Sequence, residues 1–276
     1  MYDALKGLYN MFNNKNILEV VKRRLCHGCG MCFSICPKKC IEMHHGKNGI
    51  YEPNIDSGKC INCGICLKVC SGWNLDLDGI QDNIFQGNEK NEYVGSYKNL
   101  YIGKAVSQHI FDIGSSGGFV TALLVGMKEQ GFIDGAVVAT QDDDIFWTKS
   151  IIAYNSETIC KAAGSRYNPT CPNATLKSIM EINEGKYAFV GLPCQIASLR
   201  LAEEKNSSLK NLVSVRIALF CGRMSSSFGT KCLVAKFSKK NDVVSEIKYR
   251  YGKWPGSLLI SSENGNKYSV LYKKYY

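Results

Sequence analysis

The sequence predicts a two-domain protein of the α+β and α/β classes, in which a small cysteine-rich α+β domain precedes a larger mixed α/β domain. Cysteine accounts for 14 of the 276 residues, and eight of these lie in two closely spaced runs near the N-terminus. A polar stretch follows the two runs. The remainder of the chain alternates apolar strand patterns with helical ones, which is typical of an α/β arrangement.

The two cysteine runs share one spacing. The first reads CHGCGMCFSIC and is followed by Pro37, and the second reads CINCGICLKVC and is followed by Ser71. Both have the pattern C-x2-C-x2-C-x3-C. Three thiolates two residues apart fit one face of a cubic cluster, whereas the fourth lies a turn further on and ligates the other cluster. The spacing therefore predicts two 4Fe–4S clusters, the first held by Cys26, Cys29, Cys32 and Cys70, and the second held by Cys60, Cys63, Cys66 and Cys36.

The segment between the runs predicts a pair of short strands joined at residues 46–49. Zinc is the alternative ligand, because paired C-x2-C motifs also bind zinc, but zinc sites do not normally carry the additional cysteines present in both runs. Cys40 stands beside the first run and is predicted to pack in the core. Residues 18–74 as a whole resemble a bacterial-type two-cluster ferredoxin domain.

Composition argues against several classes of protein. The first 25 residues contain scattered charges, so no secretory signal is predicted, and clustered cysteines fit a reducing cytoplasm. The densest apolar stretch, residues 119–127, is about half as long as a membrane span, so no direct membrane span is expected. The formal net charge of +10 fits a well-solvated surface, and attraction of anionic cofactors or of an acidic redox partner protein is the alternative. No nucleic-acid-binding pattern accompanies the charge.

The second half of the chain predicts alternating strands and helices. Residues 75–97 are polar and rich in Asn, Gly and Asp, which predicts a linker. A larger domain is predicted to follow this linker. Its expected elements are strands at 101–106, 135–140, 187–190 and 212–220, together with a helix at 119–130.

A loop of small residues, GSSGG at 114–118, comes directly before the predicted helix. Free N–H groups and the helix dipole at such a point favour a phosphate. The loop matches neither G-x-G-x-x-G nor a P-loop, however, so a glycine-rich helix cap is the alternative.

Two further cysteines come just after predicted strands. Cys194 follows the strand at 187–190 and lies in the first turn of a helix, and Cys221 follows the strand at 212–220. If these strands are parallel neighbours, both thiols lie at the sheet edge where open α/β sheets bind ligands. The helix start is expected to lower the pKa of Cys194, as suits a metal ligand. Small buried hydrophobic side chains are the alternative.

The motifs GSSGGFVTALL, GSRYNPT, FVGLPCQIASLR and LFCG, in this order, resemble the beta subunit family of coenzyme F-420 hydrogenases and dehydrogenases. The resemblance covers residues 98–276. It implies a flavin-binding domain that holds FAD and passes electrons between iron–sulfur clusters and coenzyme F-420. Carried onto this chain, it implies an FAD phosphate site formed by Gly114, Ser115, Ser116, Gly117, Gly118 and Arg166, and a third 4Fe–4S cluster with Cys194 and Cys221 as ligands.

One departure from the family affects the third cluster. Family members usually continue beyond the last matching region with another cysteine-bearing segment, whereas this chain stops at Tyr276. From this departure we expect either a truncated product or a short member whose missing part comes from another polypeptide. Cys160, Cys171 and Cys232 stay unassigned, and nothing in their spacing supports a third cluster.

The sequence thus predicts an iron–sulfur flavoprotein oxidoreductase that works with a redox partner or with a hydrogenase or dehydrogenase subunit. The cofactors carry out the transfer, so no catalytic side chain is assigned. Two alternatives stay open. One is a non-catalytic electron-carrier subunit, and the other is a flavin reductase of the same family acting on a non-deazaflavin substrate.

Overall fold

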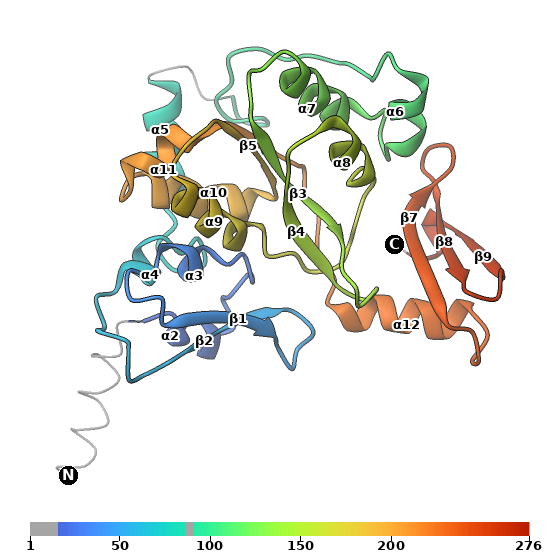
Figure 1. Ribbon diagram of the computed structural model, residues 1–276, viewed down its shortest axis with the longest axis horizontal. Helices are drawn as coiled ribbons and strands as arrows, with labels where there is room; N and C mark the ends of the chain where they lie inside the picture. Colours follow the sequence, from blue (N-terminus) through green and yellow to red (C-terminus); the bar gives the residue numbers. More distant parts are fainter. Residues whose placement is uncertain (1–15, 87–90, 276) are drawn as a thin grey trace, which may run out of the picture.

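A computed structural model describes residues 16–86 and 91–275, and its elements form three groups in space (Figure 1). The cysteine-bearing module, drawn blue to cyan, lies beneath a central mixed sheet flanked by helices. A second antiparallel sheet, drawn red, stands to one side. No helix among the described residues is both long and apolar enough to cross a membrane.

The module contains three short helices and one hairpin. Its elements are α2 (Leu18–Lys22), α3 (Met31–Ile35), β1 (Ile41–His45), β2 (Tyr51–Ile55) and α4 (Ile65–Lys68). The two strands pair antiparallel, with Ile41 opposite Ile55, which confirms the predicted strand pair. A core cluster of its own combines cysteines of both runs with Ile17, Val20, Ile41 and Ile55.

The central sheet has the strand order β4-β3-β5-β6. Strands β3 (Gly135–Gln141), β5 (Tyr187–Gly191) and β6 (Val213–Ala218) are parallel, and β4 (Thr148–Ala153) is an antiparallel edge strand. The predicted strands at 135–140, 187–190 and 212–220 are therefore confirmed, although the last is shorter because α11 occupies its first residue.

Helices cover both faces of this sheet. The elements are α6 (Gln108–Ile113), α7 (Phe119–Glu129), α8 (Ser156–Lys161), the 3-10 turn η1 (Pro172–Thr175), α9 (Leu176–Ile182), α10 (Pro193–Glu203) and α11 (Ser207–Leu212). Successive strand residues point to opposite faces. Ala136, Val138 and Ala188 therefore pack with α7 and α8, whereas Val137 and Phe189 pack with α9, α10 and α11.

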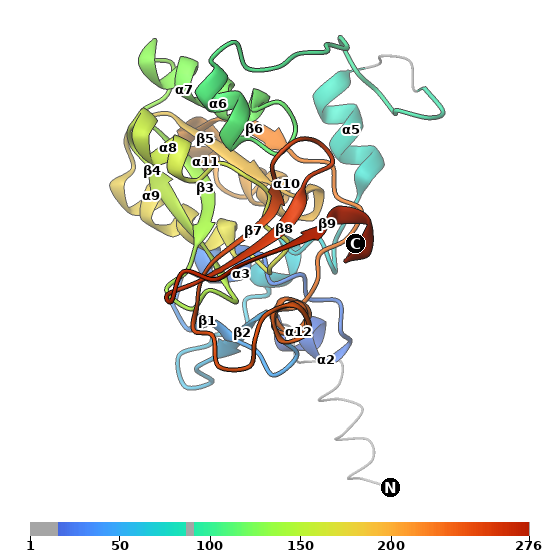
Figure 2. The ribbon, with the colours of Figure 1, turned by 90° about the vertical axis from the view of Figure 1, so that its right-hand side faces the viewer.

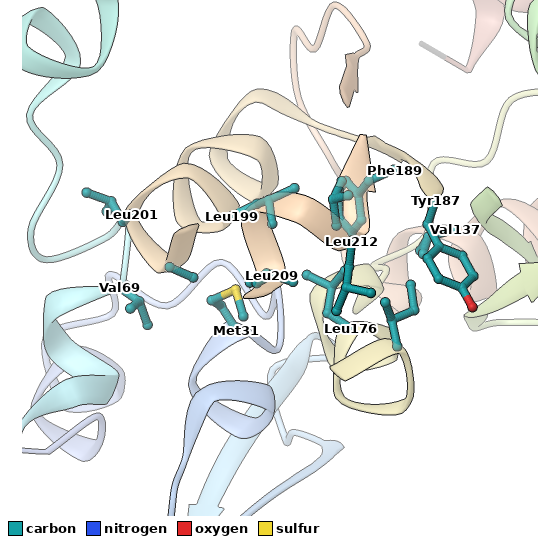
Figure 3. Close-up of a cluster of buried hydrophobic side chains, with 13 residues drawn as sticks. Met31, Val69, Val137, Leu176, Tyr187, Phe189, Leu199, Leu201, Leu209 and Leu212 are labelled. Atoms are coloured by element: carbon teal, nitrogen blue, oxygen red, sulfur yellow. The ribbon is translucent and has the colours of Figure 1, made fainter. Parts of the chain in front are cut away.

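The cysteine-bearing module shares a core with the central sheet (Figure 3). Met31 of α3 and Val69, just after α4, pack in one cluster with Leu199 and Leu201 of α10. Met31 and Val69 are 1% and 0% exposed, so the contact excludes water. Burying an apolar side chain of this size contributes roughly 1.5–3 kcal/mol, so the shared core holds the two parts in a fixed relation.

The last group is an antiparallel sheet with one helix beside it (Figure 2). Its elements are α12 (Ser227–Phe237), β7 (Val244–Tyr251), β8 (Ser257–Ser262), β9 (Lys267–Leu271) and the 3-10 turn η2 (Tyr272–Lys274). The strands follow the order β7-β8-β9. Phe146 and Tyr167 pack against its core, so this sheet rests on the central one through loops of the central group.

One local expectation was wrong, and a second segment contains an element that was not expected. The predicted strand at 101–106 is irregular and pairs with no strand among residues 16–86 and 91–275, and Ile102 and Val106 are fully exposed. The predicted linker contains a helix, α5 (Leu77–Phe85), which Asp76 caps by accepting a hydrogen bond from the Gly79 N–H at 2.9 Å. Leu77, Ile80 and Ile84 recur at helical spacing in this short element, and the aspartate cap fixes where it begins.

Candidate functional site

Four thiols from both cysteine runs gather on the side of the module that contacts α10. Cys26, Cys29 and Cys32 come from the first run, whereas Cys70 ends the second. Burial raises the pKa of the Cys70 thiol to about 12, and the charges of the Cys29 and Cys26 thiolates add to the rise. Such coupling arises only between nearby groups. The charges of Cys29 and Cys26 also act on the buried Cys32 thiol, so the structure brings together the four residues predicted for the first cluster.

A second group of thiols surrounds a small cavity inside the module. Cys36, Cys60, Cys63 and Cys66 line it together, so Cys36 crosses from its own run to the three thiols of the other. Burial raises the pKa of the Cys66 thiol to about 11, with further contributions from Cys63 and Cys36. Cys63 is exposed, which places this group at the surface of the protein.

The backbone of both runs is shaped for such groups. Gly30 precedes α3 and Gly64 precedes α4, and both adopt the left-handed conformation, with φ of 87° and 72°. Glycine adopts this conformation without steric cost, which allows the sharp turn between the second and third cysteines. At Gly30 a side chain would also meet the Cys171 Sγ at 2.5 Å. Thiolates on tight glycine turns are the donors that 4Fe–4S clusters use, so the residues present fit the group.

Two additional cysteines lie beside these groups. Cys40 is 5% exposed and belongs to the module core, as predicted, and its Sγ is 3.4 Å from the Cys36 Sγ. Cys171 is buried and lies close enough to Cys29 and Cys26 for their charges to raise its pKa further, beyond the larger effect of burial. Among the described residues, no three Cys, His, Asp or Glu side chains converge closely enough to hold a single metal ion.

The first thiol group is attached to the central sheet by polar contacts. The Cys29 Sγ lies 3.7 Å from the Ser198 Oγ of α10. The Asn173 N–H donates to the Cys29 carbonyl at 3.0 Å, and the Ser34 hydroxyl donates to the Asn173 carbonyl at 2.6 Å. Cys29 is therefore held by both η1 and α10.

A cavity of about 580 Å³ opens at the carboxyl ends of the parallel strands. Val138 of β3, Val190 of β5 and Leu219, which follows β6, line it. The predicted loop contributes Gly114, Ser115, Ser116 and Gly118, and Arg166 joins them from a different part of the chain. Gly117 is not among the residues that line the cavity, and a Cβ at this position would meet the Lys104 side chain. The volume is within the range of about 300–1,000 Å³ that small-molecule sites occupy.

The lining is suited to an anionic ligand. Helix α7 begins at the cavity, with Gly118 as its left-handed cap, so its first free N–H groups face that space. Arg166, Arg223 and Arg250 line the cavity, and no carboxylate is among its described lining residues. The Arg166 Nη1 donates to the Ala162 carbonyl at 2.9 Å, which fixes the guanidinium.

Sequence reasoning missed two of these arginines. Arg223 directly follows the LFCG motif and could have been noticed there, since it stands two residues beyond Cys221. Arg250 lies on β7 in the second sheet, and its position in the chain gives no signal of this contact.

The two cysteines that follow strands lie near each other, because β5 and β6 are parallel neighbours. Cys221 lines the cavity, whereas Cys194 stands in the first turn of α10. The expected low pKa of Cys194 was wrong. Burial, followed by the charges of Cys29 and Cys221, raises it to about 11, and these effects outweigh the helix start.

Comparison with known families identifies three matching regions. Residues 100–177 match the N-terminal part, and residues 184–275 the C-terminal part, of the family described as coenzyme F-420 hydrogenase/dehydrogenase, beta subunit. Residues 25–71 match the 4Fe–4S dicluster domain.

Individual relatives point the same way. An uncharacterized protein of Methanocaldococcus jannaschii is 26% identical, over 95% of this chain and 76% of its own length. The coenzyme F-420-dependent sulfite reductase of the same organism is 33% identical over 53% of this chain but only 25% of its own length. In the solved F-420-reducing [NiFe] hydrogenase complex of Methanosarcina barkeri, one chain superposes with a TM-score of 0.53 at 25% identity, covering 68% of this chain and 65% of that one.

Proposed function

Since this chain belongs to the coenzyme F-420 hydrogenase/dehydrogenase beta subunit family and carries a 4Fe–4S dicluster domain, we propose that it is an iron–sulfur flavoprotein that exchanges electrons with coenzyme F-420 or a similar acceptor. Two 4Fe–4S clusters and one FAD would serve as its cofactors. A hydrogenase or dehydrogenase subunit, or another redox protein, would act as the partner.

The cluster ligands follow the two thiol groups. Cys26, Cys29, Cys32 and Cys70 would hold cluster one, and Cys36, Cys60, Cys63 and Cys66 would hold cluster two. Burial holds several of these thiols protonated near neutral pH, so cluster insertion would release protons. Cluster two, with the exposed Cys63, would be the point of contact for a partner protein.

FAD would occupy the 580 Å³ cavity. The α7 N-terminus and Arg166 would bind its phosphates, since free N–H groups and a guanidinium both stabilise negative charge. Leu124, Val138 and Ile159 would exclude water from the isoalloxazine ring. When bound, a flavin supplies both one-electron and two-electron chemistry, which links single-electron clusters to a deazaflavin that accepts hydride. Arg223 and Arg250 would attract an anionic acceptor.

The contact made by α10 is the observation that carries the proposal. Gln195 on this helix lines the cavity, and Ser198, three residues further on, touches the Cys29 sulfur. At 1.5 Å of rise per residue, these two points are about 4.5 Å apart along the helix axis. One short helical segment therefore joins the ligand of cluster one to the proposed flavin site.

A third cubane would require four thiolates, of which Cys194 and Cys221 would supply only two, so we propose two clusters and no third. An iron content near twelve atoms per chain would call for such a cluster, whereas about eight would argue against it.

Anaerobic mixing with reduced coenzyme F-420 tests this function. We expect the flavin absorption band to bleach on mixing, and we expect reduced methyl viologen to drive the reverse reaction, the reduction of coenzyme F-420. The same mixing experiment with reduced nicotinamide cofactors serves as the comparison. Clusters without flavin and without reaction would instead indicate an electron carrier. A flavin that reacts only with other acceptors would indicate a reductase with a non-deazaflavin substrate.

A further inference from the structure

The two cysteine runs differ at the residue after the fourth cysteine. Pro37 follows Cys36, whereas Ser71 follows Cys70. Proline has no N–H, so the first run cannot donate a hydrogen bond from this position and the second run can. The available N–H is therefore next to Cys70, the cysteine of the second run that joins the first thiol group.

In the structure, that N–H has a definite partner. The Ser71 N–H donates to the Ser198 Oγ of α10 at 3.1 Å, and the Ser198 hydroxyl donates to the Ser71 Oγ at 2.9 Å. Ser71 is 5% exposed and Ser198 is fully buried, so water does not compete for these groups. The Ser198 Oγ is also the group that lies 3.7 Å from the Cys29 Sγ. Ser198 therefore contacts the first thiol group from the helix that also lines the large cavity.

Cluster binding determines which way these hydrogen bonds run. A cysteine ligating iron is a thiolate and can only accept, so Ser198 has to be the donor to Cys29. The Ser71 N–H occupies one lone pair of the Ser198 oxygen, and this leaves the Ser198 proton free for the sulfur. The Ser71 hydroxyl then reverses its role and donates to the second lone pair of the Ser198 oxygen, so that the 2.9 Å contact between the two hydroxyls is kept.

We propose that Ser198 is a positioning residue that donates a hydrogen bond to the Cys29 sulfur, held in place by the Ser71 N–H, and that it raises the reduction potential of cluster one. This inference rests on the proposed function, because it requires cluster one to be present. Reduction adds one electron to the cluster and no proton, and a hydrogen bond to a ligand sulfur stabilises the added negative charge. The bond lies at the contact through which electrons would pass to the flavin.

Redox titration of the full-length holoprotein, followed by electron paramagnetic resonance, tests the inference, with cluster two as an internal reference. Ser198→Ala should shift the one-electron equilibrium of cluster one several-fold toward the oxidised state, where a tenfold change corresponds to about 59 mV. Ser71→Pro should shift it in the same direction, because it removes the orienting N–H. Ser71→Ala keeps that N–H and should stay close to the wild type.

Ser208→Ala is the matched control. Its hydroxyl is on α11 and donates to Asn183 at 2.6 Å on the surface, so both potentials should be unchanged. Equal potentials in Ser198→Ala and the wild type would overturn the proposal. Complete loss of cluster one from Ser198→Ala, with normal iron in Ser208→Ala, would also overturn it by assigning Ser198 a structural role. If wild-type protein holds no clusters, the proposed function itself fails, which is a distinguishable result.

Discussion

The double substitution Cys36→Ala/Cys40→Ala should remove cluster two and lower the iron content from about eight to about four atoms per chain. Cys36 belongs to the first run but lines the cavity of the second group. Cys40 is replaced as well, because its sulfur lies 3.4 Å from that of Cys36 and could take over as ligand. Cys70→Ala should remove cluster one instead. Iron analysis and electron paramagnetic resonance of the reduced proteins measure both results.

Comparing the electron paramagnetic resonance spectra of different variants shows which cysteines share a cluster. With crossed ligation, the Cys36→Ala/Cys40→Ala spectrum should match that of Cys63→Ala, and the Cys70→Ala spectrum should match that of Cys32→Ala. If each run held its own cluster, the Cys36→Ala/Cys40→Ala spectrum would instead match that of Cys32→Ala. The Cys70→Ala spectrum would then match that of Cys63→Ala. Cys40→Ala alone should retain about eight irons, because this buried cysteine is not needed as a ligand.

Gly118→Ala should abolish most flavin binding and leave both clusters in place. Gly118 has φ +68° at the start of α7, and a Cβ there would overlap the Ile110 carbonyl oxygen. The left-handed conformation costs a residue with a side chain about 1–2 kcal/mol, and the overlap adds to that cost. The loop that lines the cavity has to rearrange. We expect at least about a tenfold weaker affinity for FAD, since 1.4 kcal/mol corresponds to that factor.

Titration of the protein with FAD, followed by absorbance and by iron analysis, measures this effect. Gly126→Ala is the control on the same helix, where a Cβ would meet open space. It should retain flavin and should stabilise α7 by about 0.5–1 kcal/mol, because alanine is the better helix former. Unchanged FAD affinity in Gly118→Ala would place the flavin somewhere other than this cavity.

The N-terminal module was predictable because its constraints are local. Two repeated spacings indicate two clusters, and the structure brings Cys70 to the first thiol group and Cys36 to the second. The intervening strand pair was also predicted, since its turn lies between short strand patterns. Helix α7 and strands β3 and β5 could likewise be predicted from local sequence, because each has a strong apolar pattern of its own.

The remaining features depend on contacts between distant residues. Residues 101–106 have the composition of a strand, yet no strand lies beside them, and side-chain pattern alone cannot reveal a missing partner. Arg250 reaches the cavity only because β7 packs next to the central group. The pKa of Cys194 depends on Cys29, which comes from the other part of the chain. Local sequence patterns encode none of these relations.

Counting iron, acid-labile sulfide and flavin in the anaerobically purified full chain tests the central claim most directly. The claim is that one polypeptide holds two cubanes and a flavin connected through α10. We expect about eight irons, about eight sulfides and about one flavin per chain. Zinc in place of iron and sulfide would contradict the claim, and so would a full iron content in protein that binds no flavin.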